Sequence, residues 1–133
     1  MVLDAEGLVK LSTGNPAALS RAKKAYARDA AVVTAATTLT EVLRGVPRDA
    51  LLHHVLRRVK VIPVDAERAR AAGELLGRSG RSWHRCALDA LVATVALAQP
   101  RPVVLLTSDT ADMARLTDEP GRPPRERVAV VRI

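Results

Sequence analysis

One stretch of the sequence, residues 87–116, constrains the fold most because it places a carboxylate within an apolar helix. Between Ala87 and Ala98 the only polar residues are Asp89 and Thr94, and a helix that is apolar on every side is a buried helix. An unpaired carboxylate in such a helix costs several kcal/mol unless it takes up a proton. Asp89 therefore needs a partner in the folded protein.

A strand and a cluster of polar residues follow this helix. Pro100 and Pro102 end the helix, and the apolar run 103–106 is typical of a strand that is covered on both faces. The polar residues that come next are Thr107, Ser108, Asp109 and Asp112. Ser108 or Asp109 can cap a helix that extends to Leu116. These acids therefore follow the carboxyl end of a strand, where open α/β sheets place their sites.

Composition indicates a globular protein with a basic surface. The 133 residues fit a single domain spanning residues 1–133, and a hydrophobic content of 48% with 26% charged residues excludes extensive disorder. The 21 basic residues exceed the 14 acidic ones, and the net charge of +7 favours a polyanionic partner such as nucleic acid. There is no Phe, and with one Tyr and one Trp a nucleic acid would be held mainly through its phosphates.

The sequence predicts a cytoplasmic protein with no membrane segment. Its N-terminus, MVLDAEG, has no basic region ahead of a long apolar core, and the apolar run 86–98 is too short and too acidic to span a bilayer. The single cysteine, Cys86, excludes an internal disulfide and agrees with a reducing compartment.

The rest of the chain alternates strand-like and helical segments. Strands are expected at 1–4, 31–36, 60–64, 103–106 and 128–133. Helices are expected at 5–11, 16–29, 41–45, 47–59 and 65–77, and the segment 78–85 is expected to be a flexible basic loop. This alternation specifies an α/β fold with a central, mainly parallel, five-stranded sheet.

The topology brings four acids to one edge of this sheet. Asp4 and Asp109 end strands, whereas Glu41 and Asp89 start helices that run back antiparallel to the strands. Carboxylates that share a small volume cannot all ionise unless a cation neutralises them, and oxygen ligands favour Mg²⁺ or Mn²⁺. Such ions support hydrolysis of phosphodiester bonds. Taken singly, Asp109 and Asp112 also fit ordinary helix-start acids and Glu41 a solvated one, but Asp89 does not.

Four segments in order resemble the PIN-domain nucleases, and among them the VapC-type toxins of toxin–antitoxin pairs. They are VLDA at 2–5, TLTEVLRG at 38–45, ALDALVATVAL at 87–97 and TSDTADM at 107–113. The resemblance implies a PIN-like three-layer α/β/α fold with strand order 3-2-1-4-5. It also implies a Mg²⁺ or Mn²⁺ cofactor, endonucleolytic cleavage of RNA by a type II toxin, a cognate antitoxin partner and a homodimer.

The same resemblance assigns roles to particular residues. The catalytic acids would be Asp4, Glu41, Asp89 and Asp109, and the metal ligands Asp4, Asp89, Asp109 and Asp112. Thr107 or Ser108 would orient the acids or the substrate. One departure is Glu6, where many relatives carry a small or hydroxyl residue; it either adds a charge to the pocket or faces solvent. For an RNA path the candidates are Arg78, Arg81 and Arg85, which a solvated loop explains nearly as well.

Other combinations of residues were weighed as functional sites. His53 and His54 are adjacent in a helix and face different directions, which does not suit a shared metal. His84 and Cys86 lack a third group that would orient them as base and nucleophile. A phosphoacceptor signalling domain would also have an acidic metal pocket, but it requires a lysine that the last strand, 128–133, lacks. A non-catalytic basic nucleic-acid-binding protein would leave Asp89 unexplained.

Overall fold

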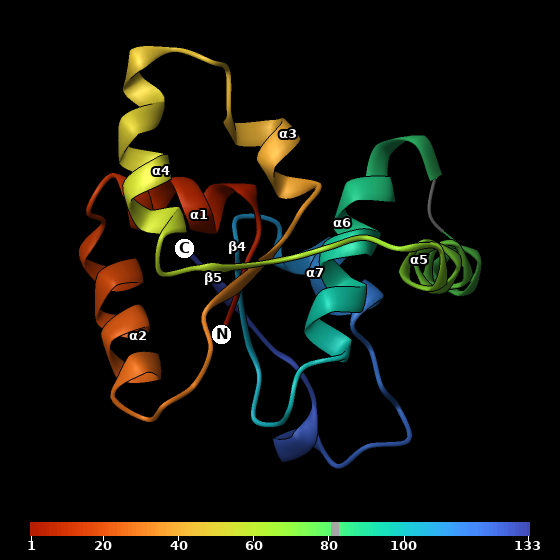
Figure 1. Cartoon of the computed structure of the whole chain (residues 1–133). Coiled ribbons are helices and arrows are strands. Elements are labelled where there is room, and N and C mark those ends of the chain that lie inside the picture. Colours follow the sequence, from red (N-terminus) through yellow and green to blue (C-terminus); the bar gives the residue numbers. More distant parts are fainter. Residues whose placement is uncertain (81–82) are drawn as a thin grey trace.

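The computed structural model describes the backbone of residues 1–80 and 83–133 and the side chains of residues 1–80 and 86–133 (Figure 1). Within these residues five strands form one sheet in the order β3-β2-β1-β4-β5. They are β1 (Val2–Leu3), β2 (Val33–Ala35), β3 (Lys60–Ile62), β4 (Val104–Thr107) and β5 (Ala129–Arg132). Every neighbouring pair is parallel. The predicted strand order is confirmed, and it differs from the 2-1-3-4-5 order of the signalling-domain alternative.

Helices connect these strands as the alternating pattern predicted. They are α1 (Ala5–Ser12), α2 (Pro16–Tyr26), α3 (Thr38–Val42), α4 (Ala50–Leu56), α5 (Ala66–Ser79), α6 (Trp83–Leu97) and α7 (Thr110–Leu116), with 3-10 turns η1 (Pro47–Asp49) and η2 (Pro124–Glu126). Side-chain caps fix several starts. Asn15 accepts from the amides of Ala17 and Ala18, and Asp65 accepts from the Arg68 amide at 2.8 Å. These caps satisfy amides that have no partner within their helices.

Several helix boundaries differ from the prediction. α5 continues to Ser79 and α6 begins at Trp83, so most of the segment 78–85 is helical rather than a flexible loop. Gly80 ends α5 with a φ of 64°, in the left-handed region that favours glycine. The first turn of α6 mixes aromatic, basic and thiol residues, so its sequence shows no helical pattern of apolar residues from which the start could be predicted. α3 begins at Thr38, so Glu41 lies inside this short helix and not at its start.

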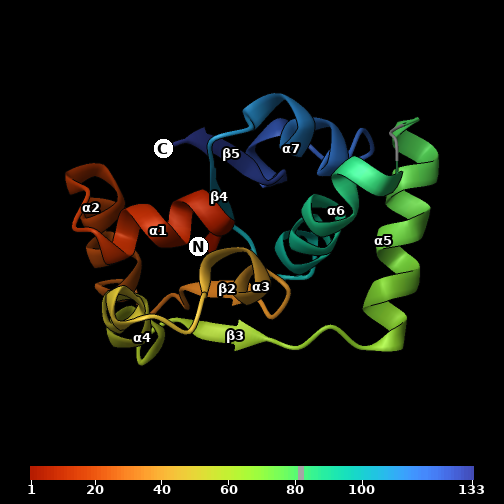
Figure 2. The same ribbon diagram turned by 90° about the horizontal axis from the view of Figure 1, so that it is seen from above.

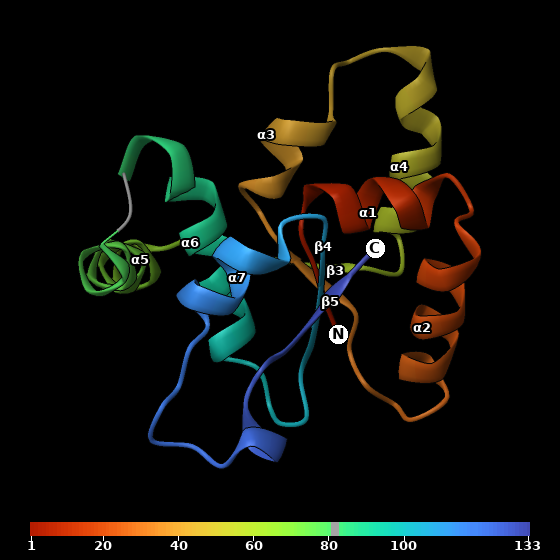
Figure 3. The ribbon, with the colours of Figure 1, turned by 180° about the vertical axis from the view of Figure 1, so that it is seen from behind.

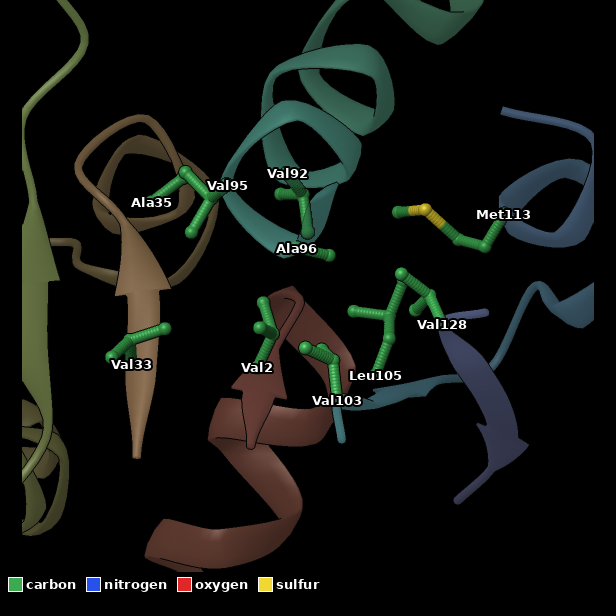
Figure 4. Packing of buried hydrophobic residues seen from close by; sticks show 10 residues of the cluster. All are labelled: Val2, Val33, Ala35, Val92, Val95, Ala96, Val103, Leu105, Met113 and Val128. Carbon is green, nitrogen blue, oxygen red and sulfur yellow. The ribbon is translucent and has the colours of Figure 1, made fainter. Parts of the chain in front are cut away.

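The sheet separates two layers of helices. α6 and α7 cover one face, where Val2 of β1 and Leu105 of β4 pack against Val92 and Met113 (Figure 4). α1, α2 and α4 cover the other face, where Leu3 packs with residues such as Leu8. Because neighbouring residues of a strand point to opposite faces, Val2 and Leu3 belong to different cores. The fold is therefore the predicted three-layer α/β/α arrangement.

Helix α5 lies outside α6 and packs against it rather than against the sheet (Figure 2). This second contact explains the nearly continuous apolar sequence of α6, which is buried between the sheet and α5. The burial is incomplete, however, because Leu88 near its amino end is 36% exposed. Within the described part of the chain, no helix has both the length and the apolar character needed to cross a bilayer.

Candidate active site

Asp4 is fixed where β1 ends and α1 begins. It is 9% exposed, and as the N-cap of α1 it accepts a hydrogen bond from the Gly7 amide at 2.6 Å on Oδ1. Its own amide donates to the carbonyl of Leu106 in β4 at 3.2 Å. Asp4 is therefore held by the sheet through its backbone and by the first turn of α1 through its side chain.

Gly7 permits this arrangement and was missed by the sequence analysis. A Cβ at this position would lie 2.9 Å from the Leu106 carbonyl oxygen and 3.2 Å from Asp4 Oδ1, closer than real contacts of this kind. Only glycine lets the first turn of α1 come so near to β4. The available signal was a glycine three residues after a strand-ending acid, in the first turn of a helix, where glycine is otherwise unfavourable.

Thr107 joins Asp4 to the loop that follows β4. Its side chain is fully buried, and its hydroxyl accepts from the Asp109 amide at 3.0 Å. Hydrogen bonds from the Thr107 hydroxyl and from the Gly7 and Ser108 backbones lower the pKa of Asp4, but burial of the carboxyl has the largest effect and raises that pKa overall. The Ser108 side chain is exposed. The geometry thus favours Thr107 over the Ser108 side chain as the residue that orients the acids.

Asp109 and Asp112 occupy the first turn of α7. Asp109 is exposed and is the N-cap, because its Oδ1 accepts from the Asp112 amide at 3.1 Å. Asp112 is half-buried, and its Oδ2 lies 3.8 Å from the Sγ of Cys86 in α6. The predicted helix cap is therefore Asp109, and Cys86 is a buried thiol beside Asp112, whereas the side chain of His84 lies outside the described residues.

Asp89 and Glu41 face the same cluster from α6 and α3. The pKa of Asp89 is raised first by burial and then by the negative charges of Asp109 and Asp4. The pKa of Glu41 is raised first by burial and then by the charges of Asp89 and Asp4. The charge of Glu6 adds a small upward shift to the pKa of Asp4. Asp89 therefore lies close enough to Asp4, Glu41 and Asp109 for their charges to interact, and Glu41 also lies close enough to Asp4.

The donor set of this cluster fits a hard divalent cation. Among the described residues, no three histidine, cysteine, aspartate or glutamate side chains converge closely enough to hold a metal ion by themselves. Mg²⁺ is commonly held by one or two carboxylates, with water and substrate phosphates completing its octahedron. Carboxylates whose pKa is raised by mutual repulsion gain most from a cation. The chemistry of the cluster therefore suits Mg²⁺ or Mn²⁺ better than a metal that needs nitrogen or sulfur ligands.

Of the three arginines expected to form an RNA path, the structure describes the side chain of Arg78 alone. Arg78 is on the exposed surface of α5, where its guanidinium lies 3.8 Å from the Glu74 carboxylate. Arg81 lies outside the described residues, and of Arg85 only the backbone, in the first turn of α6, is described. The RNA path through these residues remains a prediction.

Comparison with known proteins places the chain in a family. The family model of the PIN domain matches residues 1–118. A chain in the crystal structure of VapBC2 from Rickettsia felis, bound to a DNA fragment from their promoter, is 18% identical and superposes with a TM-score of 0.68 over 99% of this chain and 97% of that chain. A search of curated proteins finds no significant match. The structural likeness agrees with the fold, and because the family model spans most of the sequence, this protein belongs to the PIN domain family.

Proposed function

We propose that this protein is a metal-dependent endoribonuclease and the toxin of a type II toxin–antitoxin pair. The observation that carries the proposal is the cluster of Asp4, Glu41, Asp89 and Asp109, in which burial raises the pKa values of the first three and neighbouring charges of the cluster raise those of Glu41 and Asp89 further. Carboxylates with raised pKa values that gather at one place are typical of functional sites. Membership of the PIN domain family supports the same conclusion.

Asp4, Asp89, Asp109 and Asp112 are the residues that would hold Mg²⁺ or Mn²⁺, one or two of them directly and the others through bound water. The ion would supply a Lewis acid for the scissile phosphate and would lower the pKa of a water. The protein's own contribution is positioning, since the Gly7 amide and the Thr107 hydroxyl orient the Asp4 carboxylate. Glu41 is exposed, as is Asp109, and the raised pKa of Glu41 makes it a stronger proton acceptor at the edge of the site.

RNA is the substrate that the surface favours. The net charge of +7 suits a polyanion, and the near absence of aromatic residues suits binding through the phosphates. Arg78, Arg81 and Arg85 remain candidates for this contact, together with Thr107 and Ser108 beside the acids.

The proposed partners are a cognate antitoxin and a second copy of the chain. The structurally similar chain comes from a VapBC2 complex that was bound to promoter DNA, which supports an antitoxin partner for this protein. We expect the antitoxin to cover the acidic cluster with a basic side chain, the toxin to be a homodimer, and the complex to act in the cytoplasm.

Incubation of the purified protein with total RNA, followed by mapping of the cleavage sites, tests this function. Cleavage is expected with Mg²⁺ or Mn²⁺, and it should stop with EDTA and in Asp89→Asn. Glu67→Gln, a substitution of an exposed acid in the first turn of α5, is the matched control and should cleave as the wild type does. Undiminished cleavage in EDTA would refute the metal-dependent mechanism.

A further inference from the structure

A groove of about 640 Å³ lies at the edge of the sheet opposite the acidic cluster. One wall is the carboxyl half of α2 and the residues after it, with Arg21, Lys24 and Arg28. The other wall is the connection from α6 to β4, which includes Arg101. These segments lie at the same end of the molecule in opposite views (Figures 1 and 3). We call this feature the basic groove, and we infer that it is a second binding surface for the phosphates of RNA.

The basic groove is separate from the candidate active site. Val103 and Val104 line it at the start of β4, whereas Thr107, at the other end of β4, contacts Asp4. The four residues of β4 extend about 13 Å at roughly 3.3 Å each, so the two sites lie at opposite ends of the parallel strands. A ligand in the basic groove does not compete with a metal or a scissile phosphate at the acidic cluster.

Three exposed cations give the groove its charge. Arg21, Lys24 and Arg28 are spaced three and four residues apart, which places them on one side of α2 and its continuation. None of the ion pairs formed by the described residues involves them. The groove contains one carboxylate, that of Asp29, so positive charge predominates.

Arg101, in the opposite wall, differs from these cations. Its guanidinium lies 2.6 Å from the Glu119 carboxylate and also donates to the carbonyl of Glu126 at 2.8 Å. Arg101 is thus neutralised and holds the α6–β4 connection in place. The wall that contains the paired Arg101 therefore faces the side of α2 whose cations have no acidic partner among the described residues.

A phosphodiester backbone matches this combination of shape and charge. The groove is much larger than one phosphate ion, and cations spaced along a helix can each contact a successive phosphate. Gln99 and the prolines and valines after it supply the rest of the opposite wall, and an aromatic platform for base stacking is absent from the described lining. The chemistry favours contact with the backbone rather than with the bases, and hence binding that depends on length and salt.

This inference rests on the proposed function in taking RNA as the ligand. An RNA that is cut at the acidic cluster and is long or folded enough to reach the other edge of the sheet would contact both sites. Long structured RNA should therefore bind more tightly than a short oligonucleotide centred on the cleavage site, and the basic groove should supply the difference.

The test compares two triple variants of equal charge. The groove variant is Arg21→Gln/Lys24→Gln/Arg28→Gln, and the control is Arg48→Gln/Lys60→Gln/Arg70→Gln, which removes three exposed cations elsewhere. Affinity for a long structured RNA is measured in EDTA over a range of KCl concentrations. The groove variant should bind about tenfold or more weakly at low salt, and the magnitude of its slope of log K against log salt should fall by about 2–3, roughly 0.7–0.9 for each of the three lost phosphate contacts.

The control variant should lose clearly less affinity and less of the salt dependence. With Mg²⁺, both variants should still cleave the short oligonucleotide at the wild-type rate. Lys24→Glu, a single charge reversal, should give a smaller loss in the same direction, which guards against a folding defect in the triple variant. Equal losses in the groove and control variants would overturn the inference.

Two further outcomes would separate a wrong ligand assignment from a failure of the proposed function. If poly-glutamate bound the wild type more tightly than RNA with the same number of charges, and the groove variant lost this preference, the occupant would be an acidic protein and the RNA assignment would be wrong. If the wild type cleaved no RNA at all, the proposed function would fail, while the salt dependence of RNA binding would still decide whether the basic groove binds RNA.

Discussion

Gly7→Ala tests how the fold positions Asp4. The added Cβ would lie 2.9 Å from the Leu106 carbonyl oxygen, whereas ordinary contact begins at 3.4 Å, so helix and strand must separate by about 3.4 − 2.9 = 0.5 Å. The clashing atom belongs to the backbone of β4, and no flexible side chain can yield in its place. We therefore expect α1 to shift, and the 2.6 Å hydrogen bond from the Gly7 amide to Asp4 to weaken.

Two opposing effects set the size of the change. Overpacking in a well-packed region costs about 1–3 kcal/mol. Replacing glycine by alanine within a helix returns up to about 1 kcal/mol. The free energy of unfolding should therefore fall by about 1–2 kcal/mol, which for a chain of this size corresponds to a fall in Tm of about 4–8 °C.

Gly73→Ala is the matched control for this substitution. Gly73 is inside α5, and a Cβ there would have no neighbour within 4 Å. Helix propensity then acts alone, so this variant should be more stable than the wild type by up to about 1 kcal/mol. Urea unfolding and thermal melts of the three proteins in EDTA give the comparison. If Gly7→Ala were as stable as Gly73→Ala, the close approach of α1 to β4 would not constrain Asp4.

Three further expectations concern charge. Asp89→Asn removes one repelling carboxylate, so without metal the free energy of unfolding should rise by roughly 1–2 kcal/mol after allowance for solvent screening. The Tm of this variant should also respond much less to Mg²⁺ than the Tm of the wild type does. If the variant were less stable than the wild type in EDTA, Asp89 would be a structural hydrogen-bonding residue. Folding raises the pKa values of Asp4, Glu41 and Asp89, so between about pH 4 and these raised values the folded chain binds more protons than the unfolded chain. The free energy of unfolding without metal should therefore fall as pH rises through this range. An increase, measured by urea unfolding, would contradict the expectation. Backbone amides, first that of Arg44, lower the pKa of Asp49, so its opposite effect is confined to pH values below about 4. Arg101→Met should lower the free energy of unfolding by about 2–4 kcal/mol. This is less than the usual penalty for breaking a buried ion pair, because Arg122 also lies 2.8 Å from the Glu119 carboxylate. A loss below about 1 kcal/mol would show that the pair is effectively solvated.

Much of the fold followed from local patterns. Short apolar runs bounded by turns indicated the strands, and Asp109, one of two residues predicted to cap the helix after the fourth strand, is the cap in the structure. The right-handed connection of alternating strands and helices leaves few topologies, so the acids after β1 and β4 had to share one edge of the sheet. Asp89 was identified because a carboxylate in an apolar helix requires an explanation from outside that helix.

The tertiary structure decided what depends on contacts between distant segments. α6 starts at Trp83, four residues before the apolar run that begins at Ala87, and hydrophobic periodicity could not locate that start because residues 83–86 carry no apolar stripe. The requirement for glycine at position 7 arises from a carbonyl oxygen in β4, roughly a hundred residues along the chain, to which no local pattern refers.

The sequence by itself thus determined which acids end strands and which helices are apolar, because both properties belong to short segments. The burial of Asp4, Glu41 and Asp89, and hence the upward direction in which their pKa values move, was set only when the elements that carry them packed around one edge of the sheet. The basic groove has the same origin. Its cations were visible in the sequence of α2, but the opposite wall comes from the α6–β4 connection, and only folding brings the two together.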